Sequence, residues 1–151
     1  MLKNTPIYQT LSNARMLSEV DAWMKSIDID VKKDIIRFIQ DDQLTQKGID
    51  GDGDVIGLYS RATEMMTNGR KREGDRYNLN DTGAFYRSMY VRAMIDSIFI
   101  DANPIKDKDN LFLKYGENII MLTDENLQII SQKIKQKIID YTINFLSQRS
   151  K

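Results

Sequence analysis

The 151-residue sequence contains neither cysteine nor histidine. The absence of cysteine excludes disulfides, thiol nucleophiles and cysteine-based zinc sites, and the absence of histidine removes imidazole ligands and the commonest general base. An enzyme built from this chain would depend on carboxylates, lysine, tyrosine or serine, and no catalytic pair stands out among the 22 acidic residues. The composition therefore favours a protein that is not an enzyme and has no cofactor.

An excess of charge of one sign is also lacking, because 22 Lys and Arg residues balance 22 Asp and Glu residues. Zero net charge argues against a dedicated nucleic-acid-binding protein but is compatible with a local basic patch. It also removes one protection against self-association, which suits a subunit of an assembly.

Long apolar runs are lacking as well. The N-terminus has no apolar signal core, and no stretch approaches the roughly 20 apolar residues needed to cross a bilayer. We therefore expect a protein made in the cytosol, or part of something assembled there, with no membrane partner.

Apolar residues nevertheless make up 41% of the chain, enough for the core of one α+β domain over residues 11–151. Residues 1–10 lack periodicity and include Pro6, which predicts an extended arm. Apolar residues at three- and four-residue spacing predict a first helix from Leu11 to Met24. Trp23, near its end, reads as a core anchor or, alternatively, as an interface anchor.

A second helix is predicted after Asp30, which is a good N-cap residue, and Gly48 is expected to end it. Its buried face consists of apolar residues at helical spacing, namely Val31, Ile35, Phe38, Ile39 and Leu44.

Three aspartates follow the second helix. Asp50, Asp52 and Asp54 match the first, third and fifth ligand positions of an EF-hand calcium loop. The rest of the loop departs from that pattern, because Val55 stands where glycine belongs and Arg61 where the bidentate glutamate belongs. These residues are weak candidates for calcium binding, and a polar turn is the better interpretation.

Residues 67–78 form the most polar segment and contain two glycines, which predicts a flexible loop. Its four basic residues are Arg70, Lys71, Arg72 and Arg76. Such a run is either solvated surface or a contact for phosphate groups or an acidic partner.

Residues 79–88 contain an Asp-Thr-Gly motif, Asp81 to Gly83. Asp81 or Thr82 is expected to cap a short helix whose residues Ala84, Phe85 and Met89 turn inward, and Gly83 to allow a close backbone approach. Aspartic proteases carry the same three residues around a catalytic aspartate, but in two copies flanked by apolar strands. This single copy favours a structural role.

Alternating apolar residues predict a β-hairpin over residues 89–102, with a two-residue turn at Asp96-Ser97, and a bulged continuous strand is the alternative. A charged loop is expected at residues 105–110, a helical turn closed by Gly116 after it, and a short strand at residues 119–122.

The last helix is expected to start after Thr123, with Asp124 and Glu125 in its first turn, where the helix dipole favours acidic residues. It is apolar on two sides, which suits a helix that packs on its own domain and also forms a subunit interface. The predicted fold is α+β, with a small antiparallel sheet packed by N-terminal helices and this long helix.

Several short motifs resemble one protein family. They are Gly48-Ile49-Asp50-Gly51-Asp52-Gly53, Ile56-Gly57-Leu58-Tyr59-Ser60-Arg61-Ala62-Thr63 and Leu79-Asn80-Asp81-Thr82-Gly83-Ala84-Phe85-Tyr86-Arg87-Ser88. With Lys114-Tyr115-Gly116 and the start of the last helix, they resemble head–tail joining or tail-completion proteins of tailed bacteriophages and prophages of Bacteroides-type hosts. The resemblance covers about residues 45–147.

The resemblance implies a ring-forming structural subunit in the virion neck, assembled in the host cytoplasm. Its expected partners are further copies of itself and portal, neck or tail proteins. No catalytic residues carry over, and Leu79, Asp81, Thr82, Gly83 and Phe85 are expected to be structural. The alternative is a nucleic-acid-binding adaptor that uses residues 70–76, with DNA contacted in a channel.

Overall fold

The computed structural model describes residues 19–106 and 108–148, and within them the chain folds as α+β. Its helical elements are α2 (Glu19–Ser26), α3 (Ile29–Arg37), the π-helix η1 (Phe38–Lys47), α4 (Arg61–Met66), α5 (Ala84–Ser88), α6 (Leu111–Tyr115), the 3₁₀ helix η2 (Glu117–Ile120) and α7 (Asp124–Gln148). Its strands are β1 (Tyr90–Ala93), β2 (Ile98–Asp101), β3 (Ile105–Lys106) and β4 (Asp109–Asn110).

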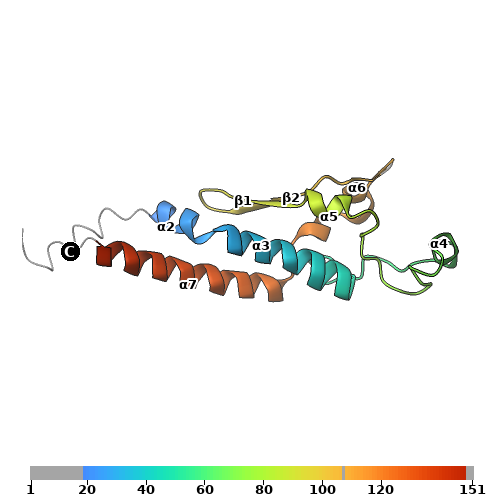
Figure 1. Ribbon diagram of the computed structural model, residues 1–151, viewed down its shortest axis with the longest axis horizontal. Helices are drawn as coiled ribbons and strands as arrows, with labels where there is room; N and C mark the ends of the chain where they lie inside the picture. Colours follow the sequence, from blue (N-terminus) through green and yellow to red (C-terminus); the bar gives the residue numbers. More distant parts are fainter. Residues whose placement is uncertain (1–18, 107, 149–151) are drawn as a thin grey trace, which may run out of the picture.

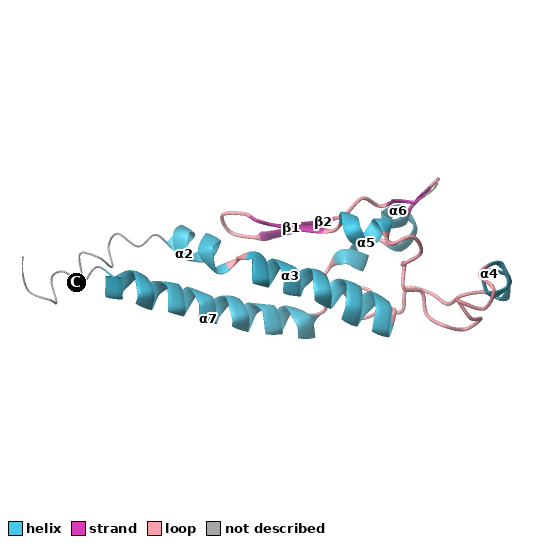
Figure 2. Ribbon diagram, in the orientation of Figure 1, coloured by secondary structure: helices cyan, strands magenta, loops and turns pink. Residues whose placement is uncertain are grey.

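These elements form three layers (Figure 1). The hairpin β1–β2 lies over α3, and α3 with η1 lies over α7, while α4 projects beyond one end of the layers (Figures 1 and 2). The predicted arm over residues 1–10 and the first half of the first predicted helix lie outside the described residues. The second half of that helix is α2, as predicted.

The middle layer begins with a cap that the sequence prediction misplaced. The carboxylate of Asp28, not Asp30, accepts hydrogen bonds from the amides of Asp30 and Val31, both at 3.1 Å. Asp28 has the extended backbone of an N-cap residue, whereas Asp30 is already helical. The carboxylate of Asp28 also pairs with Lys137 of α7, and this ion pair joins the middle layer to the layer formed by α7.

Helix α3 continues without interruption into the π-helix, which ends at Gly48 as predicted. Gly48 has φ +60°, a left-handed conformation that glycine adopts without steric cost. Of the residues predicted to face inward, Val31, Ile35, Ile39 and Leu44 are fully buried, and Phe38 is half-buried against the core. From the other layers they meet Phe85, Met89, Ile119, Ile120, Ile130 and Ile134. Gln43 of η1 is also buried, which was not predicted.

The predicted hairpin is present, but its turn is centred one residue earlier than expected. Tyr90 pairs with Asp101 and Ala93 with Ile98, and the amide of Met94 donates to the carbonyl of Ser97 at 2.8 Å. The two-residue turn is therefore Ile95-Asp96, and the unbroken register rules out the bulged strand. Trp23 of α2 donates its Nε1–H to the carbonyl of Met94 at 2.7 Å, which fixes the tip of the hairpin.

Two predictions about residues 105–122 are wrong. The segment 119–122 is not a strand, because Glu117–Ile120 is a 3₁₀ helix. A short buried apolar run does not separate strand from helix by periodicity, which explains the error. The expected charged loop 105–110 contains the hairpin β3–β4, in which Ile105 pairs with Asn110. Helix α6 closes at Gly116 as predicted.

A buried amide connects the middle layer to the start of α7. Gln43 is fully buried, and its Nε2 donates to the carbonyl of Met121 at 2.8 Å. Its Oε1 accepts from the amide of Thr123 at 3.0 Å and from Nδ2 of Asn126 at 3.1 Å. Because Thr123 is the residue before α7, as predicted, this one side chain fixes where the long helix begins.

Replacing this amide should destabilise the fold strongly. We expect Gln43→Met, which keeps the volume but leaves buried partners unpaired, to lower the free energy of unfolding by about 2–4 kcal/mol. The measurement is equilibrium urea unfolding. Gln136→Met on α7, where the amide is exposed and contacts only Asp140 in the described structure, is the matched control and should change stability by less than about 0.5 kcal/mol.

Candidate functional site: the Asp81 junction and the exposed apolar surfaces

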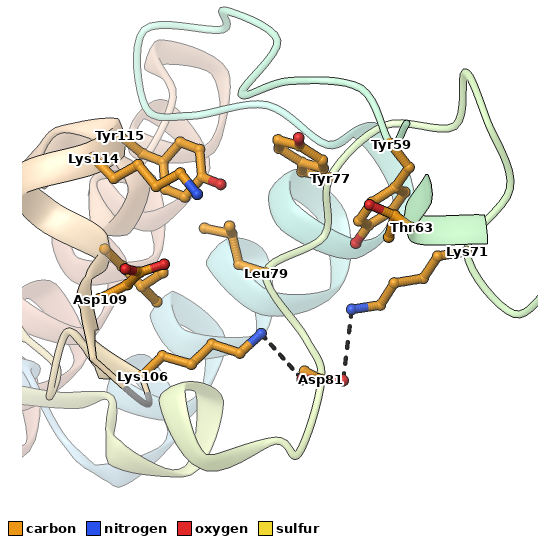
Figure 3. Close-up of a pocket in the computed structure, with 11 residues that line it drawn as sticks. Tyr59, Thr63, Lys71, Tyr77, Leu79, Asp81, Lys106, Asp109, Lys114 and Tyr115 are labelled. Atoms are coloured by element: carbon orange, nitrogen blue, oxygen red, sulfur yellow. Dashed lines mark ion pairs between the residues drawn. The ribbon is translucent and has the colours of Figure 1, made fainter. Parts of the chain in front are cut away.

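The Asp-Thr-Gly motif lies where two projecting parts of the chain meet. The carboxylate of Asp81 pairs with Nζ of Lys106 on β3 at 3.2 Å and with Nζ of Lys71 at 3.7 Å (Figure 3). Lys71 belongs to the segment that follows α4, so one carboxylate joins that segment to the β3–β4 hairpin. We refer to Asp81, Lys71 and Lys106 as the Asp81 junction.

The charges of the junction favour the ionised form of the carboxyl group. The hydrogen bond and positive charge of Lys106, followed by the charge of Lys71, lower the pKa of Asp81. An ionised carboxylate with two ammonium partners differs from an aspartic-protease site, in which two carboxyl groups share a proton. The junction is suited to holding two segments together.

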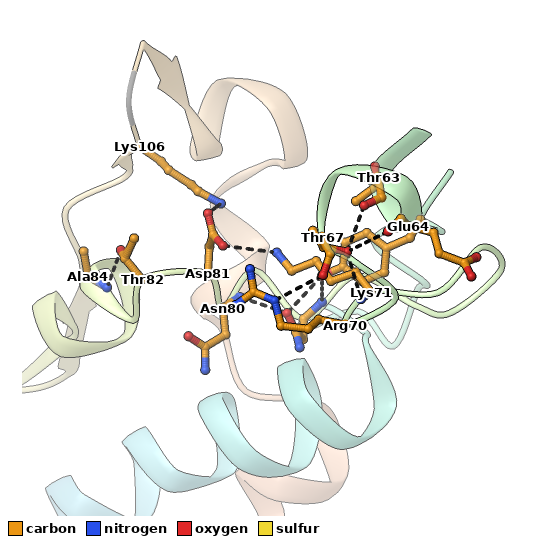
Figure 4. Close-up of polar contacts among 12 residues, drawn as sticks. Thr63, Glu64, Thr67, Arg70, Lys71, Asn80, Asp81, Thr82, Ala84 and Lys106 are labelled. Atoms are coloured by element: carbon orange, nitrogen blue, oxygen red, sulfur yellow. Dashed lines mark hydrogen bonds and ion pairs between the residues drawn. The ribbon is translucent and has the colours of Figure 1, made fainter. Parts of the chain in front are cut away.

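The other motif residues shape the backbone between the junction and α5. The expected cap by Asp81 or Thr82 is wrong, because Gly83 is the N-cap of α5 and no side chain caps the helix. Oγ1 of Thr82 accepts a hydrogen bond from the amide of Ala84 at 3.3 Å in the turn before α5 (Figure 4). Gly83 has φ +75°, and this conformation, not a close backbone approach, is what requires glycine. Phe85 is buried as predicted, whereas Ala84 is exposed, contrary to prediction.

Leu79 has an unusual backbone for its residue type. Its φ is +55°, a conformation that costs energy in a residue with a side chain. Two neighbouring contacts hold the turn: Oδ1 of Asn78 accepts from the amide of Asn80 at 3.0 Å, and the hydroxyl of Tyr86 donates to the carbonyl of Asn78 at 2.5 Å. The side chain of Leu79 packs against the core, which compensates for the strained backbone.

A cavity of about 280 Å³ opens beside the junction (Figure 3). Tyr59, Tyr77 and Tyr115 form one wall, with ring centroids 4.8 Å apart for the first pair and 5.9 Å for the second. Lys71 and Lys106 of the junction line it together with Lys114, and so does Asp109. Because Asp81 already pairs with two of the three ammonium groups, the cavity has little unbalanced charge to offer an anion.

The four basic residues of the 67–78 segment do not point to one place. Lys71 turns to Asp81, Arg76 donates to the carbonyl of Lys47 at 2.8 Å, and Arg70 donates to the carbonyl of Thr67 at 3.2 Å (Figure 4). Arg72 is exposed. Three of the four are therefore used in contacts within the chain.

The end of this segment is paired with another part of the chain. The amide of Gly74 donates to the carbonyl of Tyr59 at 3.0 Å, and the amide of Tyr77 donates to the carbonyl of Gly57 at 2.8 Å. The flexibility expected for residues 67–78 stays a prediction.

The three aspartates after the π-helix form a polar turn. Asp50 is nearly buried, and its Oδ1 accepts from the amides of Asp52 at 3.0 Å and Asp54 at 2.9 Å. Its Oδ2 accepts from Nδ2 of Asn118 at 2.7 Å. Asp50 is thus committed to local hydrogen bonds, and in the described part of the chain no three acidic side chains gather in a way that could hold a metal ion.

Apolar side chains are exposed on α7, on the face away from the core. Ile129, Ile139 and Ile143 are 46%, 50% and 56% exposed. At 3.6 residues per turn, Ile139 lies about 180° around the helix from the buried Ile130. We refer to these three residues as the outer stripe of α7. It bears out the expectation of a helix that is apolar on two sides.

A second apolar surface was not foreseen from the sequence. A groove of about 660 Å³ runs beside β2, between that strand and the beginning of α7. Its apolar lining comes from Ile98, Phe99, Ile100, Phe112, Ile120, Met121, Leu122 and Leu127. The sequence pattern predicted strand β2 but not the groove. Helix η2 lines the side of the groove opposite β2, and this part of the chain was predicted to be a strand.

No protein-family model, curated protein or solved structure matches this chain. Within residues 19–106 and 108–148, every helix is too short or too polar to span a membrane.

Removing the charge of Asp81 should loosen the junction more than the core. For Asp81→Asn we expect the free energy of unfolding to fall by less than about 1 kcal/mol, because the ion pairs are partly exposed. Amide hydrogen exchange at residues 70–76 should accelerate. Asp54→Asn, which removes the same charge at an exposed site, should leave that exchange unchanged.

The junction should also contribute to pH dependence. Because the folded-state pKa of Asp81 lies below its unfolded value, the stabilisation is fully present above the unfolded pKa and is lost as pH falls through the folded one. Asp28 and Asp42 have lowered pKa values and act in the same direction. Urea unfolding between pH 6 and pH 2 should therefore show a smaller loss of stability on acidification in Asp81→Asn than in the unsubstituted protein.

Proposed function

We propose that the protein is a structural subunit of the neck of a tailed-phage virion, where it assembles with copies of itself into a ring. The observation that carries the proposal is the outer stripe of α7. Further partners in this role are portal, neck or tail proteins.

The outer stripe is difficult to explain in a protein that acts alone. Single exposed apolar residues are common, but Ile139 and Ile143 lie one helical turn apart on the same face, and Ile129 continues that side towards the start of the helix. The core side of α7 is already occupied by its contacts with α2 and α3. A helix with a buried face and an opposite apolar stripe has a surface suited to a second protein.

The neck assignment is supported by the sequence resemblance around residues 48–63 and 79–88. The geometry of the second motif is compatible with it, because Asp81 joins two segments, Thr82 and Gly83 start α5, and Phe85 enters the core. These are architectural roles. A structural subunit requires no catalytic group, in agreement with a sequence that lacks cysteine and histidine.

The proposal predicts a homo-oligomer that depends on α7. Size-exclusion chromatography with light scattering should give a mass several times 17.5 kDa, and negative-stain images should show closed rings. We expect Ile139→Asp with Ile143→Asp to reduce the assembly to monomer, because the charges would be desolvated at the interface. Asn144→Asp with Gln148→Asp, which adds the same charge at exposed polar positions about 100° and 140° around the helix from Ile143, should still assemble.

Folding controls accompany both double variants. Because all four positions are on the surface of α7, far-ultraviolet circular dichroism and thermal unfolding should be unchanged. A protein that stays monomeric from micromolar to millimolar concentration, and also with portal protein added, would contradict the proposal.

A further inference from the structure

We propose that copies of this chain associate through their β-sheets, with the open edge of β2 in one copy accepting β1 of the next copy as an additional strand. This inference rests on the proposed function, since it adds a second contact between neighbouring copies of the ring to the one proposed for the outer stripe of α7. It is carried by three features of the hairpin: unpaired backbone on both strands, the groove beside β2, and opposite charges on the two strands.

The register shows which backbone groups are unpaired. In an antiparallel pair, hydrogen-bonded and non-hydrogen-bonded residue pairs alternate. Met94 and Ser97 form a hydrogen-bonded pair, so Arg92 with Phe99 and Tyr90 with Asp101 are the next hydrogen-bonded pairs. The pairs Ala93 with Ile98 and Val91 with Ile100 alternate with them and are not hydrogen-bonded. The backbone groups of Val91, Ala93, Ile98 and Ile100 therefore point away from the hairpin, and nothing in the described chain hydrogen-bonds to them.

The open edge of strand β2 has no proline, lysine or bulge to protect it. The sequence of β2, Ile-Phe-Ile-Asp, has high β propensity. A sheet of two strands is also marginal in water, and further strands stabilise it. Both arguments favour an added strand at this edge.

The groove shows where an added strand would lie. Residues from both faces of the sheet line it, with Ile98 and Ile100 from the core-facing side and Phe99 and Asp101 from the other. It therefore follows the edge of β2 and not one face of it. An incoming strand would lie between β2 and the apolar residues Phe112, Ile120, Met121, Leu122 and Leu127, and its inward side chains must be small and apolar.

Charge complementarity identifies β1 of a second copy as the occupant. Asp101 and Glu117 are the charged residues that line the groove, so it is acidic. Strand β1 carries one charged residue, the exposed Arg92, and its core-facing residues are Val91 and Ala93. Within its own hairpin Arg92 is opposite Phe99, and its guanidinium lies over the ring of Tyr90, 5.8 Å from the centroid. It pairs with no carboxylate of the described chain, so a carboxylate of the neighbour can approach it.

The direction of the strands fits a ring. Rotation about a ring axis keeps every copy of β1 in the same sense along that axis, and β2 is antiparallel to β1 within each copy. The pair formed by β2 of one copy and β1 of the next is then antiparallel too. The contact is heterologous and can repeat around the ring until it closes.

The first test compares Ile98→Pro with Ile98→Ala. Both remove the isoleucine side chain, but only proline removes the outward N–H, and a proline at the first residue of an edge strand is tolerated. We expect Ile98→Pro to assemble at least about tenfold more weakly than Ile98→Ala, as measured by light scattering over a dilution series. Equal thermal unfolding of the two monomers provides the folding control.

The second test exchanges the charges. Arg92→Glu and Asp101→Arg should each weaken assembly about tenfold, and the variant that carries both should recover most of the loss. Full assembly of Ile98→Pro and of both charge variants, beside an assembled wild type, would overturn the edge contact and leave the ring proposal standing. A wild type that never assembles would overturn the ring itself. Weak assembly of Ile98→Pro with no effect of Arg92→Glu would overturn β1 as the occupant.

Discussion

The buried amide of Gln43 is the interaction on which the arrangement of the layers depends. Helix α7 has no covalent reason to start beside the π-helix, because 80 residues separate Gln43 from Thr123. The amide satisfies two backbone groups just before α7, those of Met121 and Thr123, and accepts a hydrogen bond from Asn126 in the first turn of the helix. A buried polar group that meets its partners specifies one geometry, since any shift of α7 along the core would leave unpaired groups without water.

The described chain uses charge in a different way at its periphery. The Asp81 junction is partly exposed, so it contributes little energy, but it joins segments that are otherwise held by short backbone pairings. Lys133 and Lys137 of α7 similarly reach Asp34 and Asp28 at the rim of the middle layer. Strong apolar and amide contacts lie inside the fold, and weak ionic contacts lie at its margins.

Periodicity in the sequence was enough to predict the fold class, the buried face of α3 and η1, the hairpin and the long last helix, because each has a clear spacing of apolar residues. It failed at Ile119 and Ile120, where four residues are too few to show a period. The site was less predictable. That Asp81 pairs with lysines rather than capping α5 depends on Lys106, which lies on a hairpin too short to recognise. The groove beside β2 is assembled from elements distant in sequence.

One contact has a consequence for how such a chain changes over evolution. A Cβ atom at Gly51 would lie 2.7 Å from Cβ of Met121 and 2.9 Å from its carbonyl oxygen, so the turn after the π-helix fits against the chain just before α7 without spare room. The same Met121 carbonyl accepts from Gln43. Positions 43, 51 and 121 are therefore not free to vary independently. In an alignment of related chains they should covary, with a larger residue at 51 occurring only where 43 and 121 have changed as well.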